Sequence, residues 1–153
     1  MPATAPPTST TVIATWRGEQ RYDIARPGGP TTTIDGAGEA GTGPVDTLLG
    51  ALAACSAIDV EVFLVKRRTP PERLTVTVTA ERRAELPRRV MSVHLEFAID
   101  GAGVEPAHAA RAVELAVDRY CSVAASLAAD IVIGRHVVVN GVPVSTSVEA
   151  RSE

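Results

Sequence analysis

A long apolar segment, residues 48–65, is the strongest folding signal in this chain. It is long enough to enter a bilayer, but Asp59 and Glu61 interrupt it. Two carboxylates are costly in the hydrocarbon core of a membrane. The segment therefore predicts a buried helix of a globular protein rather than a membrane span.

This helix is expected to run from about Pro44 to Arg68. Proline suits a first helical turn, and Asp46 places a negative charge at the positive end of the helix dipole. Pro70 and Pro71 stop the helix. Its predicted buried stripe consists of apolar side chains at helical spacing, namely Val45, Leu48, Leu49, Leu52, Cys55, Ile58, Val62 and Val65.

A second long helix is expected from about Glu105 to Ala129. Its apolar stripe, with Tyr120 alongside, contains Val113, Val117, Cys121 and Ala124. Each of the two cysteines is therefore predicted to lie in the middle of a helix, on an apolar stripe.

Six segments predict β-strands: residues 11–17, 20–26, 31–35, 74–80, 90–99 and 131–139. The order β-β-β-α-β-β-α-β mixes hairpins with long helices, which indicates an α+β fold rather than a parallel α/β repeat. One domain is expected over residues 11–139, between a disordered leader (1–10) and a flexible C-terminal tail (140–153). Within that tail, VPVSTSV has the composition of a short edge strand.

The charge and composition argue against several partners. The net charge is -3 and only 3% of the residues are aromatic, so the chain lacks the cations and stacking rings that hold nucleic acids. The first fifteen residues contain no Lys or Arg, unlike a secretory signal. We therefore expect a cytoplasmic protein that binds neither nucleic acid nor membrane.

Two cysteines in a reducing cytosol leave three interpretations open. Such a pair is more often redox-active, catalytic or simply buried than a structural disulfide. A free cysteine also packs well as a small apolar side chain. His94, His108 and His136 lie in three different elements without ligand spacing, so no metal site is expected.

Three segments resemble the OsmC/Ohr family of osmotically inducible and organic hydroperoxide resistance proteins, and most closely its OsmC-like branch. They are GPVDTLLGALAACSAIDVEVFLVKRR (43–68), TAERRAELPRRVMSVHLEF (79–97) and RAVELAVDRYCSVAASL (111–127). The resemblance extends over about Thr11 to Val139. It implies an OsmC/Ohr-like fold in which two long central helices pack against sheets in an intertwined homodimer, with active sites at the interface.

The resemblance also implies a thiol-dependent peroxidase of oxidative stress defence, which reduces organic hydroperoxides to alcohols. Cys55 would be the peroxidatic cysteine and Cys121 the resolving one. Cys55 would become a sulfenic acid, and Cys121 would convert it to a disulfide. An external dithiol of the lipoyl type would reopen that disulfide, with no metal or organic cofactor. An apolar pocket that includes Leu48 and Leu52 would favour alkyl hydroperoxides.

Activation of the thiol is the point where the chain departs from the family pattern. Peroxidase members use an N-terminal arginine, held by a glutamate directly after the helix-opening proline. Here Val45 follows Pro44, and Asp46 is the nearest acid. Asp46 is a candidate for orienting the arginine, or a first-turn partner of the helix dipole. The candidate arginines, each also interpretable as a solvated strand residue, are Arg17, Arg21 and Arg26.

The alternative function is a non-catalytic OsmC-like protein that binds a small ligand or senses thiol oxidation. A cation beside Cys55 would favour the enzyme, because a thiol buried among aliphatic side chains is inert. A sulfur that faces Asp59 would favour the alternative, because a nearby carboxylate raises a thiol pKa. A third interpretation, in which both cysteines only fill the core, predicts sulfurs that are far apart.

Overall fold

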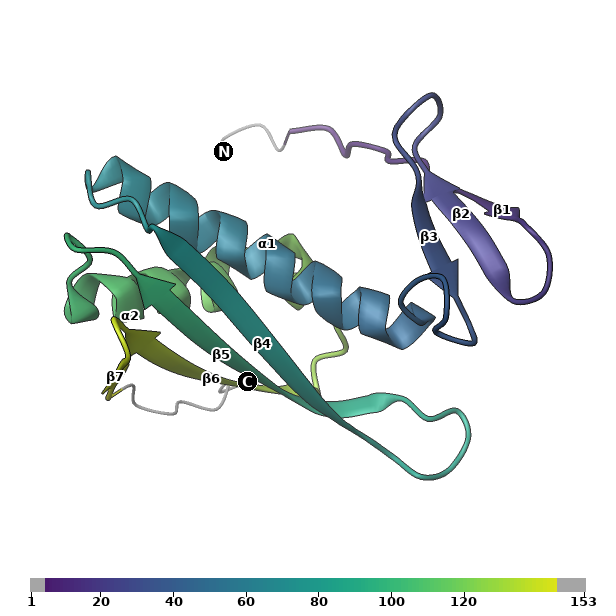
Figure 1. Ribbon diagram of the computed structural model, residues 1–153. Helices are drawn as coiled ribbons and strands as arrows, with labels where there is room; N and C mark the ends of the chain where they lie inside the picture. Colours follow the sequence, from purple (N-terminus) through teal and green to yellow (C-terminus); the bar gives the residue numbers. More distant parts are fainter. Residues whose placement is uncertain (1–4, 146–153) are drawn as a thin grey trace. The chain divides into compact units, whose positions relative to one another are not determined.

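The computed structural model describes residues 5–145, so parts of the predicted leader and tail lie outside the described residues. The chain forms two compact units, Met1–Leu48 and Leu49–Glu153. Each strand pairs only within its own unit (Figure 1). The sequence predicted one domain over residues 11–139, because a continuous apolar helix carries no signal of a division at Leu48.

The first unit is built on a three-stranded antiparallel sheet in the order β1-β2-β3. Its strands are β1 (Ile13–Trp16), β2 (Arg21–Ala25) and β3 (Thr32–Asp35), which confirms the three predicted N-terminal strands. The turn between β1 and β2 uses positive φ at Gly18 (98°) and Glu19 (51°). Glycine adopts such angles at little cost, so Gly18 favours the turn that closes this hairpin.

Asp35 orders the glycine-rich loop that follows β3. Its carboxylate is 1% exposed and accepts backbone N–H groups from Ala37 (2.9 Å), Glu39 (3.2 Å) and Ala40 (2.9 Å). These hydrogen bonds, of which those from Ala40 and Ala37 weigh most, lower the pKa of Asp35 below 3.8. Charged acceptors form strong hydrogen bonds with backbone donors, so Asp35 holds the loop in a defined turn.

The second unit contains a four-stranded sheet in the order β4-β5-β6-β7. The strands are β4 (Arg73–Arg82), β5 (Val90–Asp100), β6 (Val132–Val139) and β7 (Val142–Val144). β5 and β6 are parallel, while the other pairs are antiparallel. β7 lies within the predicted flexible tail and forms the short edge strand that its composition indicated.

One face of this sheet forms the core. Along β5, Val93, Leu95, Phe97 and Ile99 are at most 3% exposed, while His94 and Glu96 face outward. This is the alternation that the sequence predicted, because successive side chains of a strand point to opposite faces. Apolar residues of both helical segments complete the core, among them Leu52, Val60, Leu64, Ala109, Val113 and Val117.

Helix α1 (Pro44–Lys66) buries a stripe that differs from most of the predicted one. Its buried residues are Leu52, Ser56, Val60 and Leu64. From the predicted stripe, Leu48, Ile58, Val62 and Val65 are 42–57% exposed. Leu52 of the predicted stripe is buried, but the rest of the prediction was wrong because this helix is apolar nearly all round, so periodicity could not select its core-facing side. Length and apolar composition alone would let α1 cross a membrane, but this buried stripe packs into the core of the second unit.

The second helical segment is broken at Cys121. It consists of α2 (Pro106–Leu115), the π-helix η1 (Ala116–Tyr120) and α3 (Ser122–Ser126). The predicted continuous helix over 105–129 was therefore wrong, and Cys121 does not lie in the middle of a helix. Its predicted apolar stripe is confirmed, because Val113, Val117, Cys121 and Ala124 are at most 2% exposed. Tyr120, by contrast, is 55% exposed.

Candidate functional site

The break in the second helical segment gives Cys121 a specific local role. The Cys121 backbone is extended (φ -66°, ψ 104°), and the residue caps the N-terminus of α3. The Ala124 N–H donates to the Cys121 Sγ over 3.3 Å. The sulfur therefore takes the place of the Ser or Thr oxygen that usually satisfies a free N–H at a helix start.

Cys55 of α1 lies beside Cys121. Both residues are free thiols, Cys55 partly exposed and Cys121 buried. The Cys121 thiol and the N–H groups of Val123 and Ser122, at the start of α3, all act on the pKa of the Cys55 thiol, so the two thiols are near neighbours. The structure thus brings together the two cysteines that the sequence singled out, although they are 66 positions apart.

Opposing effects set the acidity of the Cys55 thiol. Burial raises its pKa above the ordinary value of 9.0, and the Cys121 thiol raises it further. The backbone N–H groups of Val123 and Ser122 lower it, because they favour the thiolate, but the net direction is upward. Among the described residues, no Lys or Arg is among the causes of this shift, and Asp59 is not among them either.

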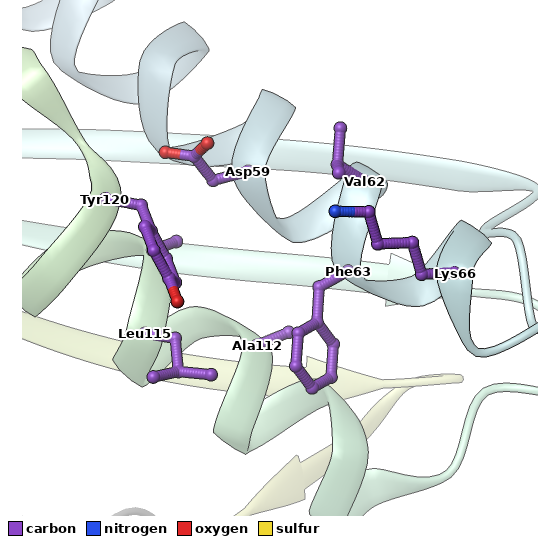
Figure 2. Close-up of a pocket in the computed structure, with 8 residues that line it drawn as sticks. Asp59, Val62, Phe63, Lys66, Ala112, Leu115 and Tyr120 are labelled. Carbon is purple, nitrogen blue, oxygen red and sulfur yellow. The ribbon is translucent and has the colours of Figure 1, made fainter.

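A pocket of about 230 Å³ lies between α1 and the α2–η1 segment (Figure 2). It is lined by Asp59, Val62, Phe63, Lys66, Ala112, Leu115, Ala116 and Tyr120. Tyr120 directly precedes Cys121 in the sequence and Asp59 follows Cys55 by one helical turn, but neither cysteine is among the lining residues. Figure 2 shows apolar side chains on its walls, with the Asp59 carboxylate and the Lys66 ammonium at separate places.

Sequence reasoning missed most of this pocket. It named Leu48 and Leu52, but Leu52 is fully buried in the core and Leu48 is not among the lining residues. Phe63 and Tyr120 could have been predicted as pocket residues. Tyr120 directly precedes Cys121, and Phe63 lies about two helical turns after Cys55.

The charged candidates of the first unit have local partners. Arg17 pairs with Asp23, and Arg21 lies within 4 Å of Glu19 (3.1 Å), Asp35 (3.5 Å) and Glu39 (3.7 Å). Asp46 lies in the first turn of α1, and within residues 5–48 it forms no ion pair with Arg17, Arg21 or Arg26. Its position fits a partner of the helix dipole, and its proposed role toward an arginine stays a prediction.

Comparisons with known proteins agree on one family. The family profile described as OsmC-like protein matches residues 36–134. Protein YhfA of Escherichia coli K12 is 40% identical over 95 residues, which cover 61% of this chain and 71% of YhfA.

Solved structures show a similar fold. An OsmC-like protein from Mycoplasma pneumoniae has a TM-score of 0.73 at 17% identity, covering 86% of this chain and 97% of that one. The organic hydroperoxide resistance protein OhrB of Bacillus subtilis has a TM-score of 0.57 at 16% identity, covering 86% of this chain and 98% of its own. At these identities the likeness shows the shared α+β fold.

Proposed function

This chain belongs to the OsmC-like protein family, and from that membership we propose that it is a thiol-dependent peroxidase that reduces organic hydroperoxides to alcohols. The observation that carries the proposal is the proximity of the Cys55 and Cys121 thiols at the start of α3. Core packing alone would not require two thiols from distant segments to meet beside free backbone N–H groups.

The proposed reaction uses Cys55 first. Its thiolate attacks the terminal oxygen of ROOH, the O–O bond breaks, and the alkoxide leaves as ROH after taking a proton. Cys55 becomes a sulfenic acid, and the Cys121 sulfur then attacks the Cys55 sulfur and releases water. Cys55 suits the first role because it is the more exposed thiol, and Cys121 suits the second because it is buried beside it.

Return to the reduced state requires an external dithiol. Thiol–disulfide exchange transfers the two electrons, and we propose a lipoyl-type dithiol as the reductant. This cycle uses only sulfur chemistry, so neither a metal nor an organic cofactor is part of the proposal.

Formation of the thiolate requires more stabilisation than the two backbone N–H groups supply. The N–H groups of Val123 and Ser122 favour the thiolate, yet the pKa of Cys55 remains raised. A guanidinium close to the sulfur would lower it. We propose that an arginine supplies this charge, and Asp46 remains the candidate for orienting it.

The exposed side of α1 supports a homodimer with active sites at its interface. Leu48, Ile58, Val62 and Val65 form an apolar surface, and each is at least 42% exposed. Apolar patches of this kind are usually covered by a partner in soluble proteins. A second copy of the chain is the proposed partner, in a soluble protein of the cytoplasm.

One observation favours the alternative function. A raised pKa leaves Cys55 largely protonated at neutral pH, which suits a slow redox sensor or a small-ligand protein better than a fast peroxidase. In that case the pocket beside Tyr120 would hold the ligand.

Intact mass spectrometry distinguishes the two functions. The reduced protein is treated with cumene hydroperoxide, alongside Cys55→Ser and Cys121→Ser variants. A peroxidase loses two hydrogens in the wild type, accumulates a sulfenic acid in Cys121→Ser and does not react in Cys55→Ser. An unchanged wild-type mass at excess peroxide would contradict the peroxidase and favour the alternative.

A further inference from the structure

An ion pair connects strand β6 to the π-helix before Cys121. Arg135 donates through Nη1 to Asp118 Oδ1 (2.5 Å) and through Nη2 to Asp118 Oδ2 (2.7 Å). The Arg135 side chain is only 11% exposed, although it is charged. Two-point contacts between a guanidinium and a carboxylate fix direction as well as distance, so this pair restrains the backbone around Asp118.

Asp118 lies in the middle of the segment that sets the orientation of Cys121. At the end of η1, the Cys121 N–H donates to the Ala116 carbonyl over 2.8 Å, five positions back instead of four. Each residue of a regular helix turns by about 100°. One extra residue in this turn therefore redirects the Cys121 side chain by about that angle, relative to an uninterrupted helix.

The redirected Cys121 then determines the environment of Cys55. It caps α3 through the Ala124 N–H, and the N–H groups of Ser122 and Val123 act on the Cys55 sulfur. The resolving thiol and these two donors thus depend on the same turn.

We propose that Arg135, acting through Asp118, is a positioning residue for disulfide formation between Cys55 and Cys121. This inference rests on the proposed thiol chemistry. In the step concerned, the Cys121 sulfur attacks the sulfur of Cys55–SOH, the S–S bond forms, the S–O bond breaks, and hydroxide leaves as water with the Cys121 proton. The ion pair holds the attacking sulfur in line and does not touch the reacting atoms.

Two conservative variants test this role. Arg135→Lys keeps the positive charge but cannot form the two-point contact with the carboxylate. Asp118→Asn keeps the size of the side chain but loses its negative charge. Sulfenic acid formation at Cys55, in which Cys121 is not a reactant, is measured in parallel and should change less than the condensation step in both variants. Condensation to the disulfide should slow by about tenfold or more, because small displacements of reacting groups carry costs of that order. A general loss of packing would not separate the two steps in this way.

A second measurement is independent of peroxide. Titration with reduced and oxidised glutathione gives the equilibrium constant of the Cys55–Cys121 disulfide, which should also fall by about tenfold or more in both variants. One outcome is that the wild type fails to react with peroxide while the disulfide equilibrium constant still falls in the two variants. That result would support the positioning role and contradict the peroxidase proposal. Circular dichroism selects the conditions under which each variant is folded.

Arg73→Lys is the matched control. Arg73 donates through Nε (3.1 Å) and Nη2 (2.9 Å) to Asp100, in a pair that joins β4 to β5 and does not include η1. Its loss should leave both measurements unchanged. Condensation rates and disulfide constants within about twofold of the wild type in folded Arg135→Lys and Asp118→Asn would overturn the proposal, because they correspond to less than about 0.5 kcal/mol.

Discussion

The Cys121 sulfur accepts the backbone N–H of Ala124 at 3.3 Å, so one of the two candidate redox thiols is also a helix cap. This relationship joins the stability of α3 to the chemistry of the site. Replacement of Cys121 should therefore have consequences that depend on whether the new side chain retains an acceptor.

Cys121→Ala should destabilise the fold more than Cys121→Ser. Alanine leaves the Ala124 N–H without its acceptor, and loss of a capping group costs about 1 kcal/mol. Serine keeps an acceptor at the same position. Chemical denaturation of the reduced proteins measures the difference, and equal free energies of unfolding for both variants would contradict a capping role.

The reductant should attack the Cys55 side of the disulfide. Cys121 is 2% exposed, while Cys55 is partly exposed, so an incoming thiol reaches the Cys55 sulfur more easily. Attack there releases the Cys121 thiolate, which the Ala124 N–H stabilises. The oxidised protein is treated with 2-mercaptoethanol and quenched with acid, and peptide mapping should place the adduct on Cys55. An adduct found mainly on Cys121 would refute this order of attack.

The pKa of Cys55 should fall when Cys121 is replaced by alanine. The Cys121 thiol is one of the groups that raise this pKa, after burial, so its removal favours the Cys55 thiolate. Iodoacetamide alkylation of Cys55, followed as a function of pH, should show its midpoint at lower pH in Cys121→Ala than in the wild type. Ser126→Ala, which alters an exposed serine of α3, is the control and should leave the midpoint unchanged.

The same shift makes stability depend on pH in a defined direction. A folded-state pKa above the unfolded value means that the folded chain holds the Cys55 proton more tightly. The contribution is complete below the ordinary thiol pKa of 9.0 and is lost as the pH rises through the folded value. The alkaline loss of stability should therefore be smaller in Cys55→Ser than in the wild type.

Ser56→Ala should stabilise the protein. The Ser56 hydroxyl is fully buried, and among the described residues it has no hydrogen-bond partner. Removal of a buried unpaired polar group recovers about 1–3 kcal/mol, which thermal and chemical denaturation would detect. Ser126→Ala is again the control, because its hydroxyl is exposed and donates to the Ser122 carbonyl at 2.7 Å. A destabilised Ser56→Ala would indicate a partner for this hydroxyl.

Val62→Glu should weaken the proposed dimer. Val62 is 44% exposed on the apolar surface of α1, and a charge there would have to be desolvated when two copies associate. Light scattering coupled to size exclusion should show a dimeric wild type and a largely monomeric variant. Val132→Glu places the same charge on an exposed valine (58%) of β6 and should remain dimeric. A dimeric Val62→Glu would place the interface elsewhere.

Sequence patterns alone determined the strands, the α+β class and the two cysteines of interest. The alternation along Val93, Leu95, Phe97 and Ile99 predicted the inner face of β5, because the period of a strand leaves only two sides to choose from. Three segments, two of which carry Cys55 and Cys121, likewise indicated the OsmC/Ohr family, and the comparisons confirm the OsmC-like family.

Tertiary structure decided the features that depend on contacts between distant residues. Helix α1 is apolar nearly all round, so only packing against the sheet selects Leu52, Ser56, Val60 and Leu64 as its buried side. The π-helix before Cys121 contains Asp118, which pairs with Arg135, 17 positions later in the chain. The spacing of apolar residues did not predict this π-helix. Cys55 and Cys121 come from segments 66 positions apart, and only tertiary packing brings them together, because local periodicity does not report contacts between distant segments.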